Sequence, residues 1–493
     1  MTTEFTTEEL DRVFGSDSTG TDPETRARSS SRLFVRSIDQ LAEFAGGATG
    51  RRLKASEALH AYGFSKLIEV ATEGAALLCD NPTAAGLALK RRRESLGLSL
   101  QDVAHQLRIS EKVLEKAERS VRAVGIDLYE TIAQHLGMDE RYISVRLTPP
   151  TDDQLAVRLR SYQNLSVSLS QRTILTLAES AWVAATQTRL ERELGLLPDL
   201  PAIERSTNYG SPGYPAYQHG YYLAQKTRSI FKLGTARLPM ALREFCEERL
   251  GIPVIYAALG AKIAGATLHI DTGHDAPLRA LVLNSEGGNE AVLVRRSTIA
   301  HELGHLIWDP SEKMQSVRVD NYEDLERDPQ LATDYVEQRA NAFGVEFIAP
   351  QAAVVGTYQD GGIEEVVREY GLGPTAARYH IWNALGRQTS LEGIGLLQPA
   401  PNMDDFAAVE RFTLDYHPFQ GLPDQLAGRF SGVVVLAATN GLISWETARQ
   451  YLGIDRKIIE NRADDVVRLF FPQLATPMVT QSVPPTTAAS GAE

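Results

Sequence analysis

Apolar residues recur three or four positions apart over much of this chain, a spacing typical of helices that pack one face onto a core. The clearest case is the segment 297–308, whose apolar stripe comprises Ile299, Leu303, Leu306 and Ile307. No proline interrupts this segment. The pattern therefore predicts one continuous helix packed against the interior.

Strand-like segments are few and short. Three of them, at 251–256, 266–270 and 279–284, lie just before the predicted helix. They predict a small β-sheet in an otherwise helical chain. The fold class predicted from these patterns is α+β and mostly helical.

Chain length and local composition divide the sequence into segments. With 493 residues the chain is too long for one ordinary core and predicts about two to four domains. The predicted segments are a disordered tail (1–30), a helical extension (31–83), an all-α domain (84–147), a helical connector (151–207), a domain with the small sheet (220–350), a helical region (351–475) and a second disordered tail (476–493). The tails are predicted from their polar composition.

The overall composition is that of a soluble globular protein, with 43% hydrophobic and 23% charged residues. A net charge of −13 excludes a uniformly basic nucleic-acid-binding surface but not a local basic patch. Cys79 and Cys246 lie far apart in sequence and predict neither a disulfide framework nor a cysteine metal site. The N-terminus lacks the pattern of a signal peptide, and no apolar run reaches about 18 residues. We therefore expect a cytoplasmic protein without a membrane partner.

The predicted helix at 297–308 carries the strongest chemical signal, His301-Glu302-x-x-His305. Residues four apart lie on one face of a helix, so both imidazoles can bind one metal ion. The glutamate beside the first histidine is placed to act as a general base rather than as a ligand. This spacing is typical of a zinc peptidase.

A zinc site needs a third protein ligand and an open position. The best candidate lies in a second predicted helix at 334–350, which ends at Pro350. Glu337 and Asn341 share one face of it, so Glu337 could bind the metal and Asn341 could hydrogen-bond a histidine ligand. The carboxylates of Asp309, Asp320, Glu323 and Asp334 are expected to lie at the surface.

Together, the H-E-L-G-H helix and the E-x-x-A-N-x-F segment resemble the ImmA/IrrE family of zinc metallopeptidases. The resemblance covers about residues 220–400. It implies a gluzincin-like domain in which Zn²⁺ is held by His301, His305 and Glu337, with Glu302 as the catalytic base. Two residues, Tyr335 and His380, are candidates for stabilising the oxyanion of the reaction.

A second motif lies in the segment 84–147. Short predicted helices at 100–107 and 111–119 are joined by a three-residue turn, the arrangement of a helix-turn-helix. The pattern L-x-x-R-R-x-x-x-G-L-S-L-x-x-V-A-x-x-L-x-I-S resembles the Xre/Cro repressor family. The resemblance implies double-stranded DNA as a partner, with contacts expected from Arg91, Arg92, Lys112, Lys116 and Arg119. A protein-docking or dimerisation role remains the alternative, because glutamates occupy the helix expected to read DNA.

The two resemblances together imply a regulatory protease. The family typically cleaves Xre-type repressors, so we expect such a repressor as the substrate, in a stress, phage or mobile-element response. The alternative is a DNA-binding transcriptional regulator whose metallopeptidase-like domain is a sensor with little or no catalysis. The connector at 151–207 is a candidate homodimer contact.

Overall fold

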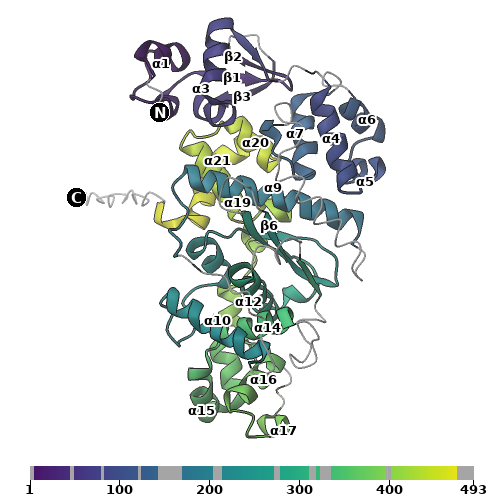
Figure 1. Cartoon of the computed structure of the whole chain (residues 1–493), viewed down its shortest axis with the longest axis vertical. Coiled ribbons are helices and arrows are strands. Elements are labelled where there is room, and N and C mark those ends of the chain that lie inside the picture. Colours follow the sequence, from purple (N-terminus) through teal and green to yellow (C-terminus); the bar gives the residue numbers. More distant parts are fainter. Residues whose placement is uncertain are drawn as a thin grey trace, which may run out of the picture.

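The computed structural model describes residues 5–44, 49–78, 81, 83–119, 124–142, 169–201, 203, 214–270, 278–309, 318–321, 335–395, 397 and 401–474. Two four-stranded sheets lie at different heights of an elongated molecule and are separated by helices (Figure 1). The fold is of mixed α and β class, as predicted.

The N-terminal part contains a small antiparallel sheet of order β3-β1-β2-β4. Its strands are β1 (Leu33–Arg36), β2 (Gln40–Glu43), β3 (Arg51–Lys54) and β4 (Ala75–Leu77), and its helices are α1 (Thr7–Phe14), α2 (Pro23–Ser29) and α3 (Ala55–Glu73). Apolar residues of all three helices and all four strands share one core.

Two predictions for this region are wrong. Residues 1–30 were expected to be disordered, but those described, from residue 5 onwards, include α1 and α2. A capping box between Thr6 and Glu9 starts α1, and Leu10, Val13 and Phe14 bury its apolar face. The extension at 31–83 was expected to be helical, yet it contains the sheet, whose strands of three or four residues are too short to show an alternating pattern.

Helices fill the segment of the predicted helix-turn-helix. They are α4 (Ala84–Ser95), α5 (Leu100–Gln106), α6 (Glu111–Arg119), α7 (Ile126–His135) and the short η1 (Glu140–Tyr142). Ser99 caps α5 through the backbone N–H of Asp102. The Xre-type identity of this segment stays a prediction.

A single long helix, α9 (Gln171–Glu193), lies in the centre of the molecule (Figure 1). Most of its residues are buried, and it contacts α7 as well as the second sheet. It is a core element rather than the connector predicted for 151–207. Residues 151–168 of that prediction lie outside the described residues, as does the tail at 476–493.

The second sheet has the order β5-β7-β6-β8. Its strands are β5 (Val254–Ala257), β6 (Ile263–Ile270), β7 (Leu278–Asn284) and β8 (Arg318–Asn321); β5 pairs with β7 in parallel and the other pairs are antiparallel. Alternate residues of a strand point to opposite faces. Val254 and Tyr256 therefore join the core with α12, whereas Ile255 and Ala257 join the core with α9.

Helices cover both faces of this sheet. On one face α12 (Val292–Trp308) packs against β6 and β7, with the short elements α11 (Leu242–Glu244), η2 (Phe245–Arg249) and η3 (Gly287–Glu290) nearby. Helices α10 (Ala216–Ile230), α14 (Tyr335–Ile348), α15 (Gln351–Tyr370) and α16 (Pro374–Ala384) share one core with α12. On the other face, α9 packs with α19 (Arg429–Thr439), which is followed by α20 (Trp445–Leu452), α21 (Arg456–Phe470) and η6 (Pro472–Leu474).

The helical region predicted at 351–475 therefore packs in two places. Its first half extends the α12–α14 layer, and its second half returns to α9 and β3 and hydrogen-bonds to α7 through Gln450. The link between them contains α17 (Leu391–Ile394), α18 (Asp404–Val409), η4 (Thr413–Tyr416) and η5 (Asp424–Leu426). In the part of the chain that the structure describes, no helix combines the length and apolar character needed to cross a bilayer.

Buried charges join the N-terminal sheet to α7 and α20; we call this cluster the arginine junction and define it as Arg36, Arg51, Glu57, Glu130 and Glu140. Arg36 and Arg51 each place an Nη atom 3.0 Å from the same Oε1 of Glu130. Arg51 also lies 3.4 Å from Glu57, and Tyr451 donates to Glu140 at 2.6 Å. Desolvation raises the pKa of Glu130 to about 7, against the opposing effect of the two arginines.

Candidate metal centre

Helices α12 and α14 cross closely at the predicted site. A Cβ at Gly304 would lie 2.9 Å from Cδ1 of Phe343, and one at Gly344 would lie 3.2 Å from the backbone nitrogen of His301. Glycine at both positions removes these obstacles. The close approach brings the first turns of α14 across from the histidines of α12.

His301, His305 and Glu337 meet at this crossing. Nε2 of His301 lies 3.1 Å from Nε2 of His305, and Oε2 of Glu337 lies 3.3 Å and 3.5 Å from those two nitrogens. Both histidines are buried, and the Glu337 side chain is 21% exposed. The spacing of the two motifs in sequence therefore brings the three predicted ligands together.

The donor set fits a zinc ion. Bonds of about 2.0–2.1 Å to a tetrahedral metal place neighbouring ligand atoms about 3.3–3.4 Å apart. The three observed separations scatter around that value. Two imidazole nitrogens and one carboxylate oxygen are the ligands of an open zinc site with one further position.

Asn341 orients the first histidine. Its Oδ1 lies 2.9 Å from Nδ1 of His301, the contact predicted from its position one turn after Glu337. An amide oxygen can only accept, so Nδ1 carries the proton and Nε2 keeps its lone pair for a metal.

Asp309 and Arg339 orient the second histidine. Oδ2 of Asp309 lies 2.8 Å from Nδ1 of His305, and Oδ1 accepts from Arg339. Asp309 was expected to be a surface carboxylate, but it is only 2% exposed. It follows His305 by one helical turn, so this spacing was the available signal. Arg339 was not predicted; it lies two residues after Glu337 and is equally buried.

Glu302 follows His301 on α12, and its side chain lies against strand β6. Its side chain is fully buried. A Cβ at Gly265 would lie 3.5 Å from its Oε1 and 3.0 Å from the carbonyl oxygen of Val282. Glycine within a strand often marks such a close approach, so Gly265 leaves room for the carboxylate.

The structure does not describe the side chains of the other three candidate ligands, and it places the two oxyanion candidates away from the ligand cluster. For Asp320 the structure describes only the backbone, in β8, while Glu323 and Asp334 lie outside the described residues. Tyr335 is 64% exposed at the start of α14. His380 is buried, and its Nε2 donates to the carbonyl of Ala349 at 2.6 Å, so this N–H is already used.

The predicted DNA contacts separate into buried and exposed residues. Arg92 is wrong as a DNA contact: it is 4% exposed and its Nε donates to the carbonyl of Leu136, which fixes α4 to the end of α7. Arg91, Lys112 and Lys116 are exposed. Arg119 is also exposed, and it pairs with Glu115 one turn earlier on α6.

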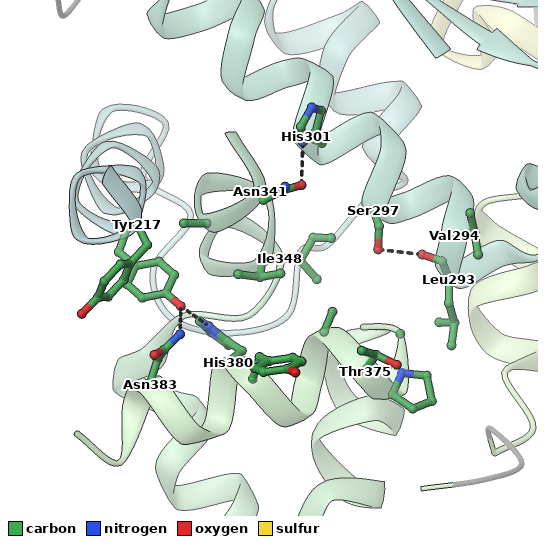
Figure 2. A pocket seen from close by; sticks show the side chains of 18 of the residues that line it. Tyr217, Leu293, Val294, Ser297, His301, Asn341, Ile348, Thr375, His380 and Asn383 are labelled. Carbon is green, nitrogen blue, oxygen red and sulfur yellow. Dashed lines mark hydrogen bonds between the residues drawn. The ribbon is translucent and has the colours of Figure 1, made fainter. Parts of the chain in front are cut away.

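A cavity of about 650 Å³ adjoins the candidate metal centre at His301 and Asn341 (Figure 2). Its walls come from α10, α12, α14 and α16 and are mainly apolar, with Leu293 and Ile348 as examples. Burial lowers the pKa of His380, in its wall, to about 4. This histidine is therefore neutral near pH 7.

Comparison with known proteins gives one family match. Residues 247–381 match the family model described as the IrrE N-terminal-like domain of peptidases, and this segment contains α12, α14 and the three clustered ligands. No curated protein and no solved structure matches the chain. The match supports a relation to the ImmA/IrrE family and an enzyme of metallopeptidase type.

Proposed function

We propose that this protein is a zinc-dependent metalloendopeptidase that cleaves a regulatory protein. The observation that carries the proposal is the meeting of His301, His305 and Glu337 beside Glu302, within the segment that matches a peptidase family. The substrate class we propose is an Xre-type repressor. Cleavage would switch gene expression in a stress, phage or mobile-element response.

The residues divide the work of hydrolysis between them. Zinc held by such a set acts as a Lewis acid that polarises a peptide carbonyl and lowers the pKa of water. Asn341 and the Asp309–Arg339 pair hold the two imidazoles in the orientation that binding requires. Glu302 accepts the proton of the attacking water and returns it to the leaving amine.

The test of this proposal uses the purified full chain. We expect about one zinc per chain, and cleavage of an Xre-type repressor that stops with a chelator and returns with added zinc. Candidate repressors are those encoded beside the gene of this protein. Zinc-loaded protein that cleaves none of them would overturn the proposed substrate class, and protein that binds no zinc would overturn the proposed mechanism.

A second candidate function is a DNA-binding regulator in which the metal domain is a sensor. It is favoured by the exposed Lys112, Lys116 and Arg119 on α6, the helix predicted to enter the major groove. The two functions differ in their response to Glu302→Gln. A DNA footprint and a transcriptional response that persist in this variant would favour the regulator.

A further inference from the structure

The cavity beside the candidate metal centre follows one face of α12. Leu293, Ser297 and His301 lie four residues apart and all line it. Four residues of helix rise about 6 Å, so the cavity runs about 12 Å from His301 towards the start of α12. That length corresponds to three or four residues of extended polypeptide, at about 3.3 Å each.

The described side chains that line the cavity carry no formal charge. No Lys, Arg, Asp or Glu is found among the described residues that line the cavity. Three of its polar groups bond to one another: Asn383 Nδ2 donates to the hydroxyl of Tyr221 at 3.0 Å, and that hydroxyl lies 3.4 Å from Nδ1 of His380 (Figure 2). A charged occupant would lose its hydration there without gaining a partner.

One side of the cavity is open to solvent. Thr375 on its rim is exposed, and Val294, Val345 and Tyr379 are half-buried. A substrate peptide can therefore enter the cavity at this rim and leave it by the same open side. A volume of about 650 Å³ lies in the range of about 300–1,000 Å³ that is typical of ligand pockets and exceeds the needs of one side chain.

We propose that this cavity is the specificity subsite of the peptidase and receives a short apolar stretch of the substrate next to the scissile bond. Leu, Ile, Val, Met and Phe are the side chains that fit its walls. The inference rests on the proposed function, because the cavity shares His301 with the centre at which the bond would be cut. To that function it adds the class of substrate sequence that is cleaved, namely one with large apolar residues next to the scissile bond.

The experiment profiles cleavage of a peptide mixture by the zinc-loaded full chain. We expect large apolar residues to be enriched at one or more positions next to the cut, with at least about tenfold preference for Leu over Ala. Val345→Trp fills the cavity from its half-buried wall, and Ser297→Leu fills it from the opposite wall. Each variant should lower kcat/KM for Leu-containing peptides at least about tenfold and spare those with Ala.

The matched control is Val355→Trp, the same change at a half-buried position of α15 that does not line the cavity. It should leave both the preference and the rate unchanged. Zinc content and circular dichroism verify that each variant is folded. Cleavage with no apolar preference, or a preference that both filling variants retain, would overturn the subsite and leave the proposed function standing.

Binding provides a readout that does not depend on turnover. N-acetyl-leucinamide should bind the zinc-loaded Glu302→Gln variant at millimolar concentration in ligand-observed NMR, N-acetyl-lysinamide should not, and Val345→Trp should abolish the signal. Failure of N-acetyl-leucinamide to bind would overturn the subsite. Binding by a wild-type protein that cleaves no peptide would overturn both proposals and leave an apolar ligand site without proteolysis.

Discussion

The candidate metal centre and the arginine junction both bury charged side chains, but they compensate the charge differently. In the junction, Arg36 and Arg51 neutralise Glu130 and Glu57 from within the protein. In the metal centre, two imidazoles and the Glu337 carboxylate converge with their donor atoms 3.1–3.5 Å apart. The negative charge of this cluster is compensated by a bound metal cation rather than by an arginine of the chain.

This difference distinguishes a structural cluster from a functional one in this molecule. The junction connects segments far apart in sequence and pairs its opposite charges within the chain, so its loss should affect folding alone. The metal centre lies on two neighbouring helices and beside an open cavity, so its loss should affect chemistry first.

The largest effect is expected at Glu302. Glu302→Gln should lower proteolysis by about 10²–10⁴-fold, because the amide cannot accept a proton from water. Zinc content should not change, since Glu302 does not belong to the ligand cluster. Peptide cleavage and atomic absorption measure the two quantities, with Glu364→Gln on the surface of α15 as the control. Cleavage at the wild-type rate would refute the assigned base.

The next largest effect is expected at Arg51. Arg51→Met leaves Glu130 and Glu57 buried without this partner and should destabilise the N-terminal part by about 3–5 kcal/mol. Its neighbour Arg52 provides a matched control, because its side chain lies at the surface, where it pairs with Glu446 and covers the ring of Phe44. Arg52→Met should cost at most about 1 kcal/mol.

Hydrogen exchange of the amides in β3 and α7 measures this loss, and zinc affinity should be equal in both arginine variants. A large loss of zinc affinity in Arg51→Met would show that the two clusters are coupled. The separation drawn above would then be wrong.

A smaller effect is expected at Asp309. Asp309→Asn keeps an oxygen near Nδ1 of His305 but removes the charge that Arg339 also contacts. Zinc affinity should fall about 10–100-fold, as is common when an outer carboxylate is lost. Competition with a chromogenic chelator measures it, with the exposed Asp360→Asn on α15 as the control. Unchanged affinity would mean that Asp309 only stabilises the fold.

How far these two regions could be predicted depends on sequence separation. The ligands of α12 follow from one helical turn, and Glu337 and Asn341 follow from a second local pattern. Asp309 was misjudged because its burial depends on Arg339, across the helix crossing. No pattern indicates the junction, whose Arg51 also contacts Thr447, 396 positions further along the chain. The short strands that carry its arginines were also missed, since three or four residues show no period.

The smallest effect concerns the pH dependence of the junction. Burial raises the pKa of Glu130 to about 7, whereas its ordinary value is 4.5. Between these values the folded chain holds a proton that the unfolded chain has released, so stability falls as the pH rises and levels off above about 7. From pH 6 to pH 8 this one group should cost about 1 kcal/mol.

Glu130→Gln tests this assignment, because the amide oxygen still accepts from Arg36 and Arg51 but cannot titrate. Exchange protection in α7 and β3, corrected for the intrinsic pH dependence of exchange, should fall less between pH 6 and pH 8 in this variant than in wild type. Glu446→Gln at the surface should keep the wild-type slope. Equal slopes in all three proteins would mean that the arginines hold Glu130 charged throughout, and the junction would then be a fixed ion cluster that pH does not loosen.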